Sequence, residues 1–335
     1  MPGRHTTMQR PSRAGPILAA VAAFAVIVAL GVYLAPRLTE ESDASGCEDT
    51  KEIAIAAPPD LTPAMATATE AMAEDDGDSA CFELSVSTVF PDSSVSQINA
   101  NTNSTPTVWI LDTKARMADL EPEAREHTRV VGSAGNTPIV LGIGQRTSHA
   151  PPASWEAAFE SSEFVLPSPS SSVASAMAIA ALGAEGDDID AVLADVADRQ
   201  AAAGLPIPDT STLLRSTHRT FGPAYWFPVT EQQYVALRMR RASWQMTALL
   251  PESGTTVLNY PIVVRTDADT DTAKVADQLS SFLSAIDGTS LLGEKGFRAP
   301  GGEIVNGAAL GPLSKVLQPT TSVPELVSAW DLAED

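Results

Sequence analysis

The chain has few basic residues for its size. Its 335 residues include 21 Lys and Arg against 42 Asp and Glu, so the formal net charge at pH 7 is -21. A surface this negative repels phosphate backbones and anionic lipid headgroups. The charge balance therefore predicts that the protein binds no nucleic acid and has no basic membrane-docking patch. Aromatic residues are also scarce, at 5%, so small aliphatic side chains must fill most of the core.

The sequence also lacks the patterns that many enzymes and metal sites carry. Its four histidines, His5, His127, His149 and His218, are scattered, and no histidine or cysteine spacing typical of a zinc site occurs. There is no G-x-S-x-G elbow, Walker loop or G-x-G-x-x-G turn. We therefore expect a protein that is not an enzyme and that uses neither a metal nor a cofactor.

One short segment does match a metal-binding motif literally. Residues 92–96 (DSSVS) have the D-x-S-x-S order of a metal-ion-dependent adhesion site. That motif needs an apolar strand running into the aspartate and a helix after the last serine. Here Pro91 interrupts the strand and polar residues follow, which predicts a loop without a metal.

A single long apolar run lies near the N-terminus. Residues 17–35 carry no charge, and at about 1.5 Å per residue a helix of this length just crosses a hydrocarbon core of about 30 Å. The basic tail at residues 1–16 predicts a cytoplasmic N-terminus, and residues 36–46 form a linker to an extracytoplasmic body. The expected location is the cell membrane, with a single pass. The alternative is a signal peptide that is cleaved.

The two cysteines are Cys47 and Cys81. Since an extracytoplasmic body meets oxidising conditions, they predict one disulfide. Each cysteine precedes a strand-like run, so the bridge would tie together the starts of two neighbouring strands. Two free thiols, or half of a metal site, are the competing interpretation.

Strand-like and helical segments alternate after the linker, a pattern typical of an α/β protein. The runs at residues 52–57 and 82–89 flank a helical pattern at residues 62–74, which predicts a parallel βαβ unit. Further strands expected in this first lobe are residues 107–111, 129–131 and 138–143. Beyond residue 151, helices and short strands predict a second lobe of similar style.

Short polar loops follow several of the predicted strands. Open α/β sheets bind ligands at the carboxyl ends of their strands, where hydroxyl and amide side chains and free N–H groups suit polar or anionic solutes. Three such loops are residues 57–60, 132–137 and 168–172. The competing interpretation is that their serine and proline residues only cap helices and form turns.

The order of several short motifs resembles a known family. The motifs are TVWILD at 107–112, SAGNTPIVL at 133–141, Trp155, LPSP at 166–169, TEQ at 230–232, LPESGT at 250–255, NYP at 259–261 and GFR at 296–298. Together they are similar to the extracellular solute-binding-like domain of actinobacterial membrane proteins, which is related to type II periplasmic binding proteins. Members commonly carry cysteines at the positions of Cys47 and Cys81. Many continue into a von Willebrand factor A domain.

The resemblance implies an α/β, two-lobe type II periplasmic-binding-protein-like fold, preceded here by the N-terminal transmembrane helix. Residues 47–145 and 246–300 would form lobe 1 and residues 146–245 lobe 2, with crossovers near residues 144–150 and 241–250. Residues 301–335 would be a C-terminal extension leading toward a von Willebrand factor A domain. The chain departs from the family at residues 111–113 (LDT), where a Pro-Asp-Ser segment is usual.

These features predict a non-catalytic domain that closes over a small polar solute or oxyanion by hinge motion. The residues expected to bind it are Asp60, Asp112, Thr113, Ser133, Asn136, Thr137, Ser170, Ser171, Ser172 and Glu231. The alternative is a scaffold or adhesion-type module with a vestigial cleft. Such a module would bind protein or cell-wall partners and act with a von Willebrand factor A domain.

Overall fold

The computed structural model gives the position of most of the chain after the linker. It describes residues 50–75, 82–100, 106–144, 150–204, 209–216, 225–240, 246–305 and 309–334. The predicted membrane helix, Cys47 and Cys81 lie outside these residues. Within them, no helix is both long enough and apolar enough to cross a membrane. Residues 51–335 form one compact unit.

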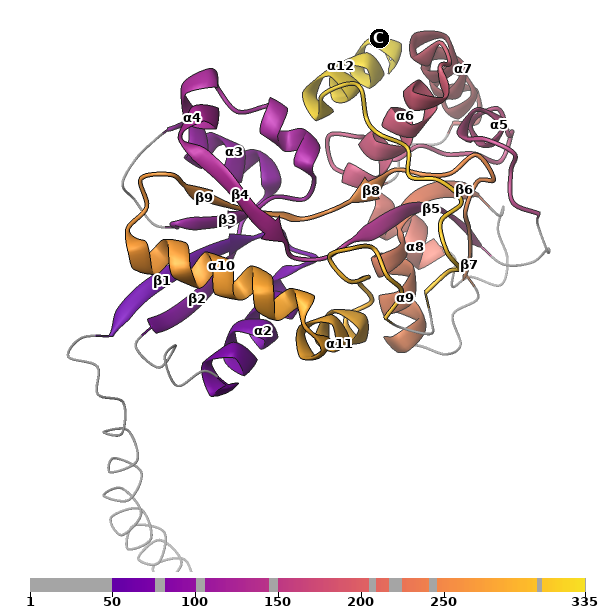
Figure 1. Ribbon diagram of the computed structural model, residues 1–335. Coiled ribbons are helices and arrows are strands. Elements are labelled where there is room, and N and C mark those ends of the chain that lie inside the picture. Colours follow the sequence, from indigo (N-terminus) through magenta and orange to yellow (C-terminus); the bar gives the residue numbers. More distant parts are fainter. Residues whose placement is uncertain are drawn as a thin grey trace, which may run out of the picture. The chain divides into compact units, whose positions relative to one another are not determined.

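The first lobe is built on a five-stranded sheet with the order β2-β1-β3-β9-β4 (Figure 1). β1 (Lys51–Ala57) pairs in parallel with β2 (Phe82–Thr88) and with β3 (Val108–Ile110). β9 (Pro261–Arg265) runs antiparallel to β3 and to β4 (Thr128–Ser133). The parallel pairing of β1 and β2 confirms the predicted βαβ unit.

Helices cover both faces of this sheet. α2 (Thr62–Asp75), α10 (Thr270–Ser284) and α11 (Ile286–Glu294) lie on one face, and α3 (Pro91–Asn99) and α4 (Pro122–Glu126) lie on the other (Figure 1). The sheet is therefore covered on both faces, as is usual where most strands of a sheet run parallel.

The packing of α10 depends on one glycine in β4. α10 buries Val275, Leu279 and Leu283 on its inner side. It approaches the sheet so closely that a Cβ at Gly132 would lie 1.9 Å from Ser280 Oγ. A larger residue at Gly132 would therefore push the helix away from the core.

The second lobe has a smaller, antiparallel sheet with the order β6-β5-β7. β5 (Thr137–Gly144) is its central strand, between β6 (Trp226–Thr230) and β7 (Met246–Leu249). The short β8 (Val257–Leu258) pairs with the start of β5. This sheet is antiparallel, whereas the predicted second lobe was similar in style to the first.

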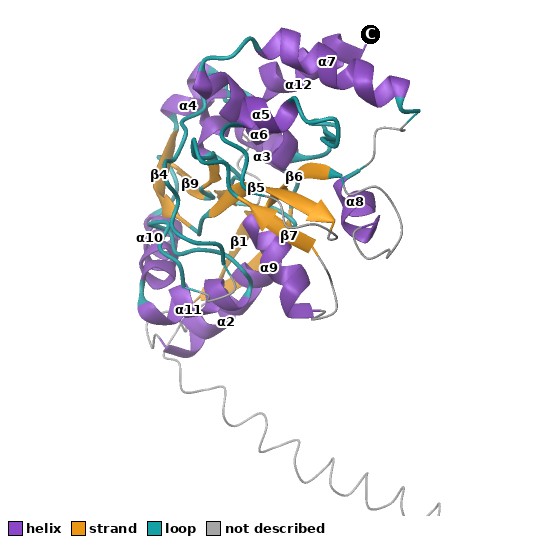
Figure 2. Cartoon of the chain, turned by 90° about the vertical axis from the view of Figure 1, so that its right-hand side faces the viewer, coloured by secondary structure: helices purple, strands orange, loops and turns teal. Residues whose placement is uncertain are grey.

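Among the described residues, six helices complete the second lobe. They are α5 (Trp155–Phe159), α6 (Val173–Glu185), α7 (Ile189–Ala202), α8 (Thr210–Ser216), α9 (Glu231–Arg240) and α12 (Val323–Glu334). α6 is buried over residues 174–182 and is apolar on all sides, as expected for a helix inside a core. The C-terminal α12 packs against α6 and α7 (Figure 2).

The chain crosses between the lobes at positions that differ from the prediction. β5 was expected in the first sheet but belongs to the second, so the first crossover is residues 134–136, not 144–150. The return crossover is residues 259–260, between β8 and β9, not 241–250. The apolar pattern of β5 could not distinguish the two sheets, because either sheet would bury that run equally well.

Two segments have secondary structure other than that predicted. The D-x-S-x-S segment at residues 92–96 lies in α3, not in a loop, and Pro91 is in the first turn of that helix. Proline is favourable there, because its missing N–H would have no helical partner. The sequence pattern of residues 114–126 predicts one continuous helix, but these residues form a 3₁₀ turn at Lys114–Ala118 followed by α4.

A third stretch of chain also links the lobes. After α11, Arg298 forms an isolated bridge with Asn136 of the first crossover, and Val316 forms another with Thr255 next to the second. Gly254 permits this path, because a Cβ there would lie 2.4 Å from the backbone oxygen of Lys315, and its φ is +112°. The part of the C-terminal extension around Val316 therefore lies against the hinge.

Candidate functional site

The carboxyl edge of β1 and β3 is where the order of the first sheet reverses. From β1 the chain moves outward to β2 and then passes back over β1 to β3. Open α/β sheets bind ligands at this kind of switch point, because the connections on its two sides diverge and leave a crevice. Asp60 follows β1 and Asp112 follows β3, so the fold brings two predicted residues to this edge.

Asp60 is anchored by a buried tyrosine. The Tyr260 hydroxyl donates a hydrogen bond to Asp60 Oδ2. Tyr260 is fully buried, packs edge-on against Phe297, and is the non-glycine residue with positive φ (+32°) among those described. Burial raises the pKa of Asp60, and it raises the pKa of Tyr260 well above its usual value. Asp60 itself stays partly exposed, so it is the member of the pair that a solute can reach.

Asp112 is buried with one of its carboxylate oxygens unbonded. Its Oδ1 lies 3.3 Å from Arg116 Nε, while its Oδ2 has no hydrogen-bond partner. Burial raises the pKa of Asp112 to about 6, although the Arg116 guanidinium acts in the opposite direction. A buried acceptor without a donor is costly to leave unsatisfied. Its Oδ2 is therefore a candidate acceptor for a hydrogen bond from a solute.

Negative charge exceeds positive charge around Arg116. Its Nη1 lies 2.5 Å from Asp92 Oδ1 and 3.7 Å from Asp119 Oδ2, so one guanidinium faces three carboxylates, including Asp112. Both oxygens of Asp119 are buried without a hydrogen-bond partner. Asp92, by contrast, is 78% exposed at its side chain. The first-lobe edge thus has a net negative field, with the Asp92 carboxylate exposed and the unpartnered oxygens of Asp112 and Asp119 buried.

The predicted serines of the second lobe divide into two groups. Ser170 and Ser171 are exposed and bond only within their own loop, to Ser168. Ser172 is buried and caps α6, accepting from the Ser175 N–H at 3.3 Å, and it also accepts from the Thr210 hydroxyl at 3.1 Å. Only Ser170 and Ser171 therefore keep hydroxyl groups available to a ligand.

The predicted residues near the first crossover bond to the protein itself. The Ser133 hydroxyl donates to the Asn259 carbonyl at 2.6 Å. Asn136 donates from Nδ2 to the Ala299 carbonyl at 3.2 Å. Thr137 Oγ1 accepts from the Gln232 N–H at 2.9 Å. These side chains hold the crossovers and the C-terminal segment in register.

Glu231 also has a partner inside the protein. It is fully buried and forms a two-point ion pair with Arg298, with Nε–Oε2 at 2.7 Å and Nη2–Oε1 at 2.8 Å. Its Oε1 accepts a further bond from the Leu310 N–H, and the Arg298 guanidinium donates to the carbonyls of Leu310 and Gly311. The pair joins α9 of the second lobe to the C-terminal segment. Glu231 therefore has a structural contact where a ligand contact was predicted.

Two residues that bond to the predicted carboxylates of this edge were not on the predicted list, Arg116 and Tyr260. Arg116 stands four residues after Asp112 and pairs with it across one turn, a spacing that is readable in the sequence. Tyr260 belongs to the NYP motif, but its role depends on the return crossover, which was predicted elsewhere. Thr113 was predicted and caps the 3₁₀ turn through its hydroxyl.

A cavity of about 880 Å³ lies where the crossovers meet the C-terminal segment, and we call it the hinge pocket. Its lining residues are Thr113, Lys114, Ala115, Asn136, Pro138, Val257, Asn259, Arg298, Gly301, Gly302, Glu303, Ile304, Pro312, Leu313, Val316, Leu317, Gln318 and Pro319. It takes in the predicted Thr113 and Asn136, while most of its walls come from the C-terminal segment.

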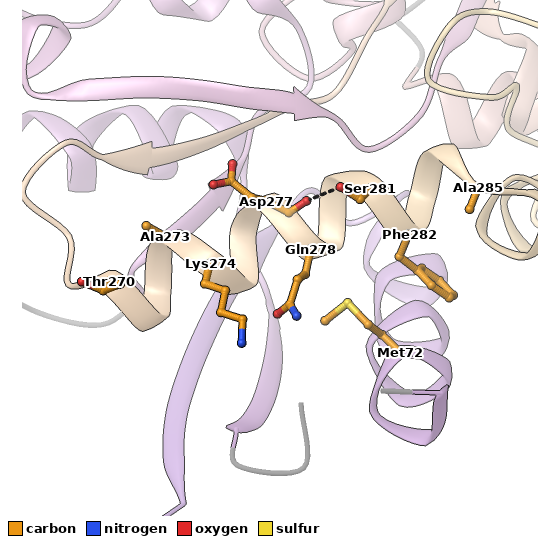
Figure 3. Close-up of a pocket in the computed structure, with 9 residues that line it drawn as sticks. All are labelled: Met72, Thr270, Ala273, Lys274, Asp277, Gln278, Ser281, Phe282 and Ala285. Atoms are coloured by element: carbon orange, nitrogen blue, oxygen red, sulfur yellow. Dashed lines mark hydrogen bonds between the residues drawn. The ribbon is translucent and has the colours of Figure 1, made fainter. Parts of the chain in front are cut away.

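A groove of about 720 Å³ runs along α10 on the first lobe. Figure 3 shows Lys274 and Gln278 extending from α10 on the side of Met72, which comes from α2. The lining comes from the first lobe alone, so this groove is not formed between the lobes. In the described part of the chain, no group of three or more His, Cys, Asp or Glu side chains is placed to hold a metal ion.

The fold is that of type II periplasmic substrate-binding proteins. A ferric binding protein from Campylobacter jejuni is 11% identical, with a TM-score of 0.64 over 84% of this chain and 99% of that one. A periplasmic thiamin binding protein is 14% identical, with a TM-score of 0.60 over 87% and 98%. The substrate binding domain of a putative molybdenum ABC transporter from Clostridium difficile is 15% identical, with a TM-score of 0.51 over 75% and 99%.

No protein-family model and no curated protein matches the sequence. The similarity to known proteins therefore lies in the fold, and identities of 11–15% do not transfer a ligand.

Proposed function

We propose that this protein binds a small polar solute between its two lobes and does not transform it. The observation that carries this proposal is the switch point, where Asp60 and the unbonded oxygen of Asp112 stand at the carboxyl edge of the first sheet. The solved structures with this fold include a ferric binding protein, a thiamin binding protein and the substrate binding domain of a putative molybdenum transporter. Each of them is named for a small solute. Their names support binding as the function.

The chemistry of the first-lobe edge narrows the class of solute. Asp60, Asp112 and Asp119 supply acceptors, and three carboxylates surround the single guanidinium of Arg116. A solute with hydroxyl, amide or ammonium donors would satisfy these oxygens, whereas a free oxyanion would meet a negative field. We therefore favour a donor-rich polar solute over the oxyanion that the serine loops alone suggest.

We also propose that the body is held outside the cytoplasm by the helix at residues 17–35, with Cys47 bonded to Cys81. The apolar run and the basic tail before it support this arrangement. Protease protection of the full chain in membrane vesicles, and alkylation of the two cysteines with and without reduction, test both parts.

The binding proposal is tested by thermal melting of the full chain against sugars, amino acids, organic amines and oxyanions. A solute at 100 times its Kd adds about 2.7 kcal/mol to the stability of the protein. For a unit of this size that is a shift of about 2 °C or more per kcal/mol. Asp60→Asn should reduce the shift, while Asp277→Asn on the surface of α10 should leave it unchanged.

A scaffold with a vestigial cleft is the second candidate. The observation in its favour is that five predicted binding side chains, those of Ser133, Asn136, Thr137, Ser172 and Glu231, already bond inside the protein. Such a module would bind protein or cell-wall partners and act with a von Willebrand factor A domain. A flat melting response to every solute class, with the fold intact, would contradict solute binding and favour the scaffold.

A further inference from the structure

The hinge pocket is not lined by Asp60 or Asp112, and its walls have mixed character. Val257, Ile304 and Val316 line it, and the last two are 40% and 45% exposed, which is unusual for large aliphatic side chains. A volume of about 880 Å³ is within the range of small-molecule sites. The pocket thus offers apolar surface that a ligand of a few residues would remove from water.

Two opposite charges that have no ion-pair partner among the described residues also line this pocket. The Lys114 ammonium has no ion pair within the described residues, and its backbone N–H is held by Asn259 Oδ1 at 2.8 Å. The Glu303 carboxylate likewise has no ion pair there. It folds back over Gly301, where a Cβ would lie 2.5 Å from Glu303 Oε2. The third charged group, Arg298, is neutralised by Glu231.

We propose that the hinge pocket binds a short apolar peptide with both termini free, with its carboxylate toward Lys114 and its ammonium toward Glu303. An apolar organic acid would leave Glu303 unmatched, and an apolar amine would leave Lys114 unmatched. A zwitterion with an apolar body complements both charges and the aliphatic walls together. Because both crossovers line the pocket, a bound peptide would also touch the parts of the chain that bend when the lobes move.

The probe is the dipeptide Leu-Leu, titrated into the full chain by calorimetry beside its N-acetyl and its C-terminal amide forms. Leu-Leu should bind saturably, and each capped form should bind about tenfold more weakly, because each loses one charge-assisted contact. Failure of Leu-Leu to bind, or equal binding of the capped forms, would overturn the proposal.

Two substitutions assign the ends of the peptide. In Lys114→Gln, Leu-Leu and its amide should bind equally weakly. In Glu303→Gln, Leu-Leu and its N-acetyl form should bind equally weakly. Lys274→Gln in the groove along α10 removes the same charge elsewhere and should bind Leu-Leu like the unmodified chain (Figure 3). If either pocket variant still prefers Leu-Leu over the matching capped form, the assigned orientation is wrong.

This inference does not rest on the proposed solute at the switch point. Within the described residues, neither Lys114 nor Glu303 forms a hydrogen bond or ion pair with Asp60 or Asp112, so both pocket variants should keep the thermal response to that solute. If a variant folds poorly, the capped dipeptides on the unmodified chain still decide the matter.

Discussion

The protein contains two buried arginine clusters that differ in how completely their charges are satisfied. At the hinge, Arg298 meets Glu231 at two points and donates to two carbonyls, and Glu231 also accepts a backbone N–H. At the first-lobe edge, Arg116 faces three carboxylates whose buried oxygens are partly unbonded. A saturated buried pair fixes a structure, whereas unbonded acceptors leave hydrogen-bonding capacity for a ligand.

Breaking the saturated cluster should have the largest effect. Glu231→Gln removes the charge that balances Arg298 while keeping the side-chain shape, and a buried charge left without its partner costs about 3–5 kcal/mol. Urea unfolding of the full chain measures this loss. The double variant Glu231→Leu with Arg298→Met should recover much of it, since no buried charge then remains. A loss below about 1 kcal/mol for Glu231→Gln would show that water reaches this pair.

The unsaturated cluster should make stability depend on pH. Burial raises the pKa of Asp112 from 3.8 in the unfolded chain to about 6 in the folded one, so the folded state holds the proton more tightly. Folding is therefore favoured below pH 4, and this contribution is lost as the pH rises through about 6. One proton gives a slope of about 1.4 kcal/mol per pH unit, or about 3 kcal/mol in all.

Unfolding free energies between pH 4 and pH 7 test this expectation. Asp112→Asn should flatten the slope, while Asp209→Asn at the exposed start of α8 should not. A slope of the same size in Asp112→Asn would assign the effect to other carboxyls, with Asp60 the first to examine, because burial raises its pKa too.

Displacing the C-terminal segment from the hinge should have an intermediate effect on stability. Gly254→Ala places a Cβ 2.4 Å from the Lys315 carbonyl at a φ of +112°, so it should cost about 2 kcal/mol through strain and displacement of the segment. Hydrogen exchange at the Leu317 N–H, which donates to the Thr255 carbonyl, reports the displacement directly. Gly204→Ala, at a positive φ with open space around it, is the control for backbone strain alone.

Removing one hydroxyl from the first-lobe edge should have the smallest effect. Tyr260→Phe deletes the hydrogen bond to Asp60 and should cost about 1 kcal/mol of stability. It should also raise the pKa of Asp60 further, since that bond stabilises the charged carboxylate. The Asp60 titration followed by NMR decides this. A lower pKa in the variant would mean that water replaces the hydroxyl.

The sequence predicted most of the elements but not the connection between the lobes. The sequence located β1, α2 and β2 within a few residues, because two strand-like runs flank a helical pattern there. β5 is apolar on both sides in either sheet, so its assignment to the second lobe required long-range pairing. The same limit hid Tyr260, whose partner Asp60 lies far away along the chain.

The surroundings of the predicted site residues were harder to predict than the fold. Loop position pointed to Asp60 and the family resemblance pointed to Asp112, and the structure places both at one sheet edge. Loop position could not show that Ser133, Asn136 and Thr137 form their hydrogen bonds inside the protein, because short polar side chains bond to turns and to ligands equally well. The hinge pocket was missed because its walls come from residues 301–319, which have little periodicity.

The described chain enters the fold through β1 in the first lobe and leaves it through α12, which packs on the second lobe. Anything attached before β1 therefore moves with one lobe, and anything attached after α12 moves with the other. A change in the angle between the lobes would alter the distance between those two attachments. Tension applied between the two attachments would therefore act across the hinge between the lobes.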